Sequence, residues 1–265
     1  MQEEESSSSE LKAVAAGLVG HRFSDKGWVE KKVNLPKEMD LTISVNQQEL
    51  ATILCTPFEL KYLVFGFLYA AGIISGVGDV MMMRVCDDDP LADVRLSSSE
   101  FSMPTKRTIT SGCGGGTIFD TKGQEVESSL VIAPTEVLAL MKQFQAKMEL
   151  YPLSGGVHTS ALSDAREMLV VAEDIGRHNT LDKIQGECLL REISTRDSLL
   201  LTTGRISSEM LLKVASMQTP VVVSRHSPTD RAVSLAWDLG ITLVGHVRGR
   251  SLMVYSHPER LGRSA

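Results

Sequence analysis

The sequence predicts an α/β protein (α+β overall), with a smaller β-rich N-terminal portion and an α/β domain in the second half. Two observations carry this prediction. After residue 150, short apolar strand segments alternate with helical segments. Before residue 130, segments of alternating apolar and polar residues are typical of strands, and one apolar helical segment interrupts them. A chain of 265 residues is long enough for one large domain or two modest ones.

The composition is that of an ordinary globular protein, with 43% hydrophobic and 23% charged residues. No apolar run approaches the roughly 18 residues of a membrane span. The acidic, serine-rich N-terminus lacks the features of a signal peptide. We therefore expect a cytoplasmic protein without membrane contact, in which residues 1–20 form a disordered tail, residues 21–130 the β-rich portion with a cysteine-containing loop, and residues 131–265 the α/β domain.

The two halves of the chain differ in charge. Residues 1–150 hold 14 Lys+Arg against 21 Asp+Glu, whereas residues 151–265 hold 13 against 12, and 11 of those 13 are Arg. Arginine binds phosphates and carboxylates through two parallel hydrogen bonds, so the second half is suited to an anionic ligand. A drift in composition is the alternative. The balance is not basic enough to predict nucleic-acid binding.

The N-terminal portion is predicted to contain strands and one helix. WVEKKVNLP (28–36) and DLTISVNQQEL (40–50) are typical of two strands joined by a short turn. In the helical segment 56–74, Thr56 is the expected N-cap, with Pro57 at the first helical position. VMMMRVCDDD (80–89) and ADVRLSS (92–98) are further strands, in which we expect the methionines to fill the core; a pliable apolar surface is the alternative.

The second half is predicted to form a mostly parallel sheet with helices on its faces. A helix over residues 133–149, with Thr135 as its capping residue, precedes it. The expected strands are EMLVVAED (167–174), DSLLLTTG (197–204), PVVVS (220–224), ITLVGHV (241–247) and LMVYS (252–256). The expected helices between them are TLDKIQGECLLREI (180–193), RISSEMLLKVASMQ (205–218) and RAVSLAWDLG (231–240).

Four loops after these strands each carry arginine with small or hydroxyl residues. Ligands of such sheets bind beyond the carboxyl ends of the strands, near helix N-termini, so the loops predict a nucleotide-like or phosphate-bearing ligand. The loop residues are Glu173, Asp174, Gly176, Arg177, His178 and Asn179; Thr203, Gly204, Arg205, Ser207 and Ser208; Ser224, Arg225, His226, Ser227, Pro228 and Thr229; and His246, Arg248, Gly249 and Arg250.

These residues also have structural alternatives. Helix capping would explain Asn179 or Thr180, and Ser207 and Ser208, while an ion pair with Asp174 or Asp182 would explain Arg177. The turn SGGVHTS (154–160), with His158, either lets the backbone approach a ligand closely or is an ordinary connector.

Cys113 is surrounded by glycine in TITSGCGGGTIFD (108–120). Glycine costs backbone entropy and packs nothing, so a buried structural cysteine does not need such neighbours. The pattern predicts a reactive thiol on a flexible loop; the alternative is a tight glycine turn that contains a cysteine. The remaining cysteines, Cys55, Cys86 and Cys188, form no CxxC pair, which argues against a structural zinc site or a disulfide scaffold.

Several motifs together resemble the formate dehydrogenase accessory sulfurtransferases, the FdhD family. They are FGFLYAAGII, ITSGCGGG, GGVHTSAL, EDIGRHNTLDK, TTGRISSEM, SRHSPTDRAVSLAWDLGITLVGHVRG and VYSHPERL, and the resemblance runs from about residue 25 to 261. It implies a sulfurtransferase that carries sulfur as a persulfide on Cys113 from a cysteine desulfurase to the molybdenum or tungsten of a bis(molybdopterin guanine dinucleotide) cofactor, as formate dehydrogenase requires. It further implies a homodimer and a cytidine deaminase-like, three-layer C-terminal domain.

The resemblance also implies where the cofactor binds. The stretch His246, Val247, Arg248, Gly249, Arg250 and Ser251 matches the region that the family associates with the guanine-dinucleotide portion, for which GDP-like nucleotides are mimics. With the loops described above, the other expected cofactor-binding residues are Arg177, His178, Asn179, Thr203, Gly204, Arg205, Ser227 and Thr229. No residue is expected to bind a metal directly.

One position departs from the family pattern. Many bacterial members have CxxC in this loop, whereas Gly116 stands here at the second position. A single thiolate is sufficient to carry one persulfide, and His158 or His178 is expected to stabilise it by charge or by a hydrogen bond. The alternative is a non-catalytic carrier or chaperone that binds the cofactor and the dehydrogenase. A zinc deaminase would need H-x-E and P-C-x-x-C, which the sequence lacks.

Overall fold

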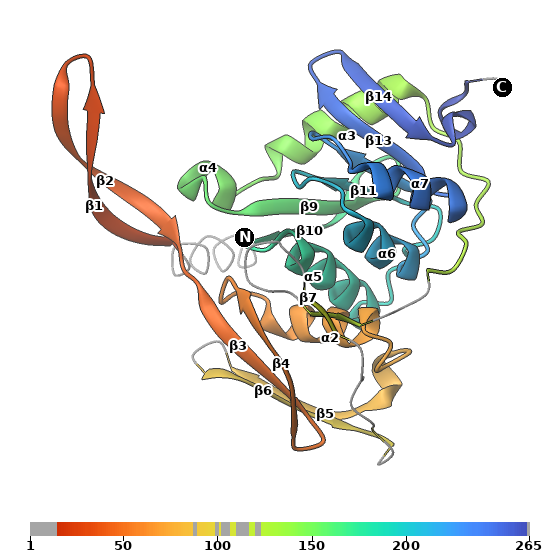
Figure 1. Cartoon of the computed structure of the whole chain (residues 1–265), viewed down its shortest axis with the longest axis horizontal. Coiled ribbons are helices and arrows are strands. Elements are labelled where there is room, and N and C mark those ends of the chain that lie inside the picture. The colour runs from red at the N-terminus through yellow and green to blue at the C-terminus, as the bar shows by residue number, and fades with distance from the viewer. Residues whose placement is uncertain are drawn as a thin grey trace.

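The computed structural model describes residues 15–86, 89–98, 101, 107–109, 117–119 and 123–263. An N-terminal unit and a larger C-terminal unit pack together, and one hairpin projects from them (Figure 1). The hairpin consists of β1 (Ala15–Ser24) and β2 (Gly27–Pro36). Residues 15–20 therefore belong to a strand and not to the predicted tail. Because β2 pairs with β1, the predicted pairing of residues 28–36 with 40–50 is wrong.

The N-terminal unit is a four-stranded sheet covered by one helix. The strand order is β4-β3-β6-β5. Alternate residues of β3, such as Leu41 and Ile43, are buried against the helix. The elements are β3 (Met39–Val45), β4 (Gln48–Cys55), α2 (Leu60–Ala70), η1 (Val77–Asp79), β5 (Val80–Cys86) and β6 (Asp89–Leu96), followed by the short pair β7 (Arg107–Ile109) and β8 (Thr117–Phe119).

Two local predictions in this unit differ from the structure. Helix α2 begins at Leu60, because its N-cap is Glu59 in the left-handed conformation with φ 55°. Thr56 is not the cap. Among the three methionines only Met83 packs against the core, whereas Met81 and Met82 are exposed on the edge strand β5.

The C-terminal unit is built on a six-stranded sheet with the order β10-β9-β11-β12-β13-β14. Its strands are β9 (His158–Ser163), β10 (Met168–Asp174), β11 (Leu199–Thr202), β12 (Val221–Ser224), β13 (Thr242–Arg248) and β14 (Ser251–Ser256). Its helices are α3 (Pro134–Ala146), α4 (Leu150–Ser154), α5 (Arg177–Leu190), α6 (Ser208–Ser216), α7 (Asp230–Asp238) and η2 (Pro258–Leu261).

This sheet is mixed, and the expectation of a mostly parallel sheet is wrong. Only the neighbours β11, β12 and β13 run parallel, and each of their connections contains a helix. The pairs β9–β10 and β13–β14 are joined by short turns, which force antiparallel pairing. β9 also runs antiparallel to β11.

The unit has three layers. On one face of the sheet, residues such as Leu200 and Val222 pack against α5, α6 and α7. On the other face, residues such as Leu201 and Val223 pack against α3. Helix α3 has Ala133 as its N-cap, and the Glu136 carboxylate accepts from the Ala133 N–H at 2.8 Å, so Thr135 is not the cap.

Helices α2 and α5 join the two units at a very close crossing (Figure 1). A Cβ at Gly66 would lie 1.8 Å from the carbonyl oxygen of Asp182, and one at Gly186 would lie 1.9 Å from that of Tyr62. Only glycine fits at either place. The chain reaches the C-terminal unit before residue 131, since Val126 is part of its core. Within the described residues, no helix is long and apolar enough to cross a membrane.

Candidate functional site

The strand register brings the four predicted loops to one edge of the six-stranded sheet. The parallel strands β11, β12 and β13 all end there. Ser160 of β9 lies opposite Thr202, so the antiparallel β9 begins at this edge with His158. Asp174 of β10 lies opposite His158 and therefore ends at the same edge. We call this the carboxyl edge; it comprises loops 174–179, 203–207, 224–229 and 246–251.

Three helices begin at the carboxyl edge, so their unpaired N–H groups and positive dipole ends lie there. Ser207 caps α6 by accepting from the Met210 N–H at 3.4 Å, which confirms its capping interpretation. Thr229 caps α7 in the same way. The N-cap of α5 is Gly176, which supplies no side-chain bond. Of the three helices, α5 is therefore the one whose N-cap residue offers no side-chain acceptor to the first N–H groups.

The first turn of α5 presents Arg177 and His178. The Nε atom of Arg177 is buried and has no hydrogen-bond partner among the described residues. A Cβ at Gly204 would lie 3.2 Å from the Cβ of Arg177, so the glycine lets the next loop approach the helix closely. A buried donor without a partner costs about 1–3 kcal/mol, which makes the Arg177 guanidinium a suitable place for an external acceptor.

Both histidines beside Arg177 are neutral near pH 7. Burial, with the charges of Lys213 and Arg177, lowers the pKa of His178 to about 3. Burial and Arg177 also lower the pKa of His158. The 3.3 Å contact of His178 Nε2 with Glu209 is therefore not an ion pair at neutral pH. Of the two roles predicted for these histidines, charge is disfavoured and hydrogen bonding remains.

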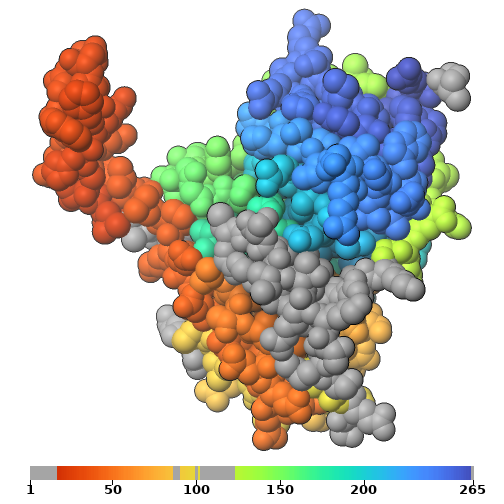
Figure 2. All heavy atoms as spheres, in the orientation of Figure 1, coloured from red at the N-terminus to blue at the C-terminus, as the bar shows by residue number. Residues whose placement is uncertain are grey.

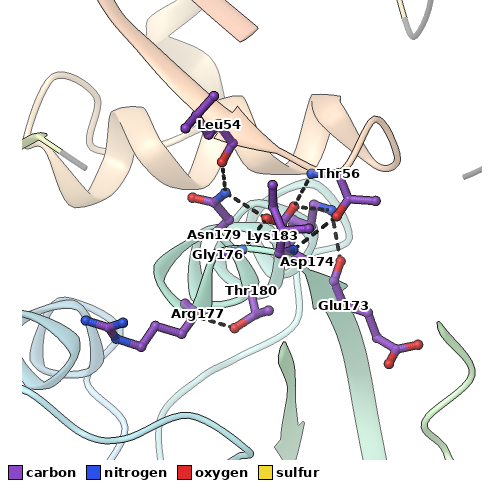
Figure 3. A network of polar contacts seen from close by, with 10 residues as sticks. Leu54, Thr56, Glu173, Asp174, Gly176, Arg177, Asn179, Thr180 and Lys183 are labelled. Atoms are coloured by element: carbon purple, nitrogen blue, oxygen red, sulfur yellow. Dashed lines mark hydrogen bonds and ion pairs between the residues drawn. The ribbon is translucent and has the colours of Figure 1, made fainter. Parts of the chain in front are cut away.

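A buried ion pair links α5 to the end of β10 (Figure 3). Lys183 Nζ lies 2.8 Å from Asp174 Oδ2, and both side chains are 0% exposed. The same carboxylate accepts from the N–H of Thr56 at 3.1 Å, the N–H of Gly176 at 2.8 Å and Nδ2 of Asn179 at 2.7 Å. Such complete hydrogen bonding is what allows a charged pair to be buried.

The ion pair predicted as an alternative role of Arg177, with Asp174 or Asp182, is wrong, because both carboxylates pair with lysines. Asp174 pairs with Lys183, and Asp182 pairs with Lys213. The sequence reasoning missed Lys183, which lies nine positions after Asp174 and carries no local signal. Nothing in the spacing shows that the two side chains meet.

The network also ties the two units together. Asn179 Nδ2 donates to the Leu54 carbonyl at 2.8 Å (Figure 3). The Ile175 N–H donates to Thr56 Oγ1 at 3.1 Å. The end of β4 is thus held against the loop that begins α5. Asn179 is not a helix cap, and Thr180 instead donates to the Arg177 carbonyl at 2.8 Å.

The predicted cofactor-binding residues fall into three groups by exposure. Those that are buried and support the edge from inside are Asn179, Thr203, Gly204 and Val247. Those that are half-buried are Arg177, His178, Ser227 and Thr229. Those that are exposed are Arg205, His246, Arg248, Gly249, Arg250 and Ser251. Only the last two groups are accessible at the surface of the carboxyl edge, and they contain four arginines.

The backbone of His246 is unusual. Its φ of 51° lies in the left-handed region, which non-glycine residues seldom adopt. Its N–H donates to the His226 carbonyl at 3.3 Å, and the pairing of β13 with β14 shifts between Gly245 and Arg248. Strained backbone of this kind concentrates at functional sites.

Cys113 and Gly116 lie outside the described residues. Cys55 and Cys188 are buried, and burial raises the pKa of each thiol to about 12. Neither is a thiolate at neutral pH, so neither is suited to replace the missing second cysteine. Cys86 is the last residue of β5, and its side chain also lies outside the description.

A cavity of about 300 Å³ lies at the opposite end of α6 from the carboxyl edge. It is lined by residues that include Tyr69, Gly123, Leu212 and Ser216, and by none of the predicted site residues. Within the described part of the chain, no three His, Cys, Asp or Glu side chains are grouped to hold a metal ion.

Comparison with known proteins relates this architecture to one family. The model of the FdhD/NarQ family matches residues 36–262. The sulfur carrier protein FdhD of Bacillus pumilus (strain SAFR-032) is 39% identical over 249 residues, covering 91% of this chain and 95% of its own. That of Staphylococcus aureus (strain MRSA252) is 39% identical over 258 residues, covering 94% and 97%. A crystal structure from Desulfotalea psychrophila, assigned as a formate dehydrogenase accessory protein, matches with a TM-score of 0.80 and 25% identity over 94% of this chain and 99% of that one.

Proposed function

This chain belongs to the FdhD/NarQ family, and from that membership we propose that it is a cytoplasmic sulfurtransferase for formate dehydrogenase. It carries sulfur as a persulfide on Cys113, from a cysteine desulfurase to the molybdenum or tungsten of the bis(molybdopterin guanine dinucleotide) cofactor. The observation that carries the proposal is the family match over residues 36–262, which spans both the glycine-flanked Cys113 and the carboxyl edge. We also propose that it acts as a homodimer.

The loading step needs one thiolate. The Cys113 thiolate attacks the outer sulfur of the desulfurase persulfide, and a new sulfur–sulfur bond forms on Cys113. The sulfur–sulfur bond of the donor breaks, and its cysteine leaves as a thiolate, so no further oxidant or reductant is required. The burial of Cys55 and Cys188 supports Cys113 as the carrier.

The carboxyl edge is suited to the anionic part of the cofactor, which is the acceptor of the sulfur. Arg205, Arg248 and Arg250 are exposed there, beside the starts of α5, α6 and α7. Helix N-termini and arginine both bind phosphate well. Arg177, with its unpaired Nε, is the donor best placed to be completed by a ligand. The three layers of this unit also support the proposed likeness to the cytidine deaminase fold.

Sulfur loading on Cys113 tests the proposal directly. Incubated with a cysteine desulfurase and cysteine, the wild-type chain should gain the mass of about one sulfur atom in intact-mass spectrometry. Cys113→Ala should gain none, because it lacks the nucleophile, and Cys86→Ala is the matched control that should gain as the wild type does. If the folded wild type gains no sulfur yet binds GDP, the protein is a non-catalytic carrier and the sulfurtransferase assignment fails.

GDP binding tests the carboxyl edge separately. Arg177→Gln should weaken GDP binding about tenfold or more in isothermal titration calorimetry, because a hydrogen bond to a charged group contributes about 1.5–3 kcal/mol. Arg166→Gln is the control, since Arg166 is exposed on the turn between β9 and β10, at the opposite edge. Equal affinity of the Arg177 variant and the wild type would remove Arg177 from the binding site.

A further inference from the structure

The hairpin of β1 and β2 stands apart from the rest of the molecule (Figures 1 and 2). We call residues 15–36 the arm. Its two ten-residue strands pair from Ala15 opposite Pro36 to Ser24 opposite Gly27. At its base the arm contacts the rest of the molecule. There α4 packs against it, and a Cβ at Gly156 would lie 3.0 Å from the Pro36 side chain. Towards its tip the arm extends into solvent.

The arm exposes more apolar surface than an isolated hairpin can sustain. Between residues 17 and 36 no side chain is buried. The large apolar side chains that are between 43% and 70% exposed are Leu18, Val19, Phe23, Trp28, Val29 and Leu35. A two-stranded hairpin alone is at best marginally stable in water, and apolar surface gathered in this way marks an interaction site.

Both faces of the arm are apolar. Leu18 lies opposite Val33 on one face, and Phe23 lies opposite Trp28 on the other. The Phe23 and Trp28 rings, with centroids 5.0 Å apart, form an aromatic pair near the tip. A flat partner surface would cover only one face. In a two-fold symmetric dimer both faces of each arm can be covered. One face then lies on the main part of the second copy, and the other face lies against the arm of that copy.

Size and charge favour a second copy of this chain as the partner. If each copy places its arm on the other, each contributes two ten-residue strands to the interface. This is close to the roughly 20–30 residues that each side of a stable interface contributes. The arm carries Arg22, Lys26, Lys31 and Lys32 against Asp25 and Glu30, whereas the whole chain has a net charge of −6. A basic arm and an acidic remainder attract each other between two copies.

The family match begins at residue 36, where the arm ends. The relative from Staphylococcus aureus nevertheless aligns over 94% of this chain, a span that reaches into the arm. We propose that the arm is the dimerisation element: each arm lies on the second copy, with Phe23 and Trp28 as its anchors. This rests on the proposed homodimer and is independent of the sulfur transfer.

Sedimentation velocity over a concentration series tests the arm. The wild type should be dimeric at micromolar concentration, and Trp28→Ser should raise the dimer dissociation constant at least tenfold, as loss of an aromatic anchor does. Met81→Ser is the matched control, because Met81 on β5 is 71% exposed and Trp28 is 70% exposed. It should leave the dissociation constant unchanged.

The outcomes separate the arm from the homodimer. A wild type that is monomeric throughout the series overturns both. If the Trp28→Ser variant dimerises as the wild type does, the proposed role of the arm is overturned but the homodimer is not. Fluorescence avoids any folding defect of that variant: in Trp237→Phe, Trp28 is the sole tryptophan, and its emission should shift to shorter wavelength as the dimer forms. If the emission stays unchanged while the dimer forms, the arm is not part of the dimer interface and the proposal is overturned.

Discussion

Lys183→Met should lower the free energy of unfolding by about 3–5 kcal/mol. The substitution leaves the Asp174 carboxylate buried, with the N–H groups of Thr56 and Gly176 and the amide of Asn179, but without its cation. A buried charge that loses its partner keeps its desolvation penalty and loses the compensating attraction. Urea unfolding followed by circular dichroism measures the loss.

Two further variants make this prediction specific. Arg191→Met removes an ion pair between the half-exposed Arg191, at the C-terminal end of the same helix, and Glu187, and should cost at most about 0.5 kcal/mol. Adding Asp174→Asn to Lys183→Met removes the orphaned charge and should recover part of the stability. A Lys183→Met protein as stable as the Arg191 control would show that the pair contributes little.

Gly66→Ala should destabilise the protein by about 3 kcal/mol, at the upper end of what overpacking usually costs. The new methyl group would lie 1.8 Å from the carbonyl oxygen of Asp182, which is backbone and cannot rotate away. Helices α2 and α5 must therefore separate. Because α5 also holds Arg177 at the carboxyl edge, GDP binding should weaken together with stability.

Gly76→Ala is the matched control for this substitution. A Cβ at Gly76 would meet nothing within 4 Å, and its φ of −176° is open to any residue. Its thermal midpoint should stay close to that of the wild type, whereas that of Gly66→Ala should fall by several degrees. Equal midpoints would mean that the two helices adjust to the extra methyl group without cost.

Most elements of the C-terminal unit were predictable because their signals are local, but β9 (His158–Ser163) was missed, because its first residues were assigned to the turn 154–160. Runs such as LLL at 199–201 and VVV at 221–223 are buried on both faces of a sheet, and such continuous apolar runs indicate central strands. The direction of the outer strands was not predictable in this way. It depends on which strands become neighbours, and pairing is decided by contacts far apart in the sequence. The same limit explains why β2 was assigned the wrong partner.

The helix starts show a similar division. Ser207 caps α6 as its residue type predicts. Thr56 has the same capping chemistry, yet its hydroxyl accepts from Ile175 and its N–H donates to Asp174. A tertiary partner more than a hundred positions away competes for this residue, and the local pattern contains no trace of that competition.

The sequence by itself determined the family motifs, the alternation of strands and helices after residue 150, and the arginine-containing loops. These features depend on residue type and spacing. Only the tertiary structure decided which loop residues are exposed at the carboxyl edge and which, like Asn179 and Thr203, are buried beneath it. It also decided that His178 is neutral and that Lys183 meets Asp174. The physical reason is that desolvation and ion pairing depend on what packs around a group in space, and residues distant in the chain provide that packing.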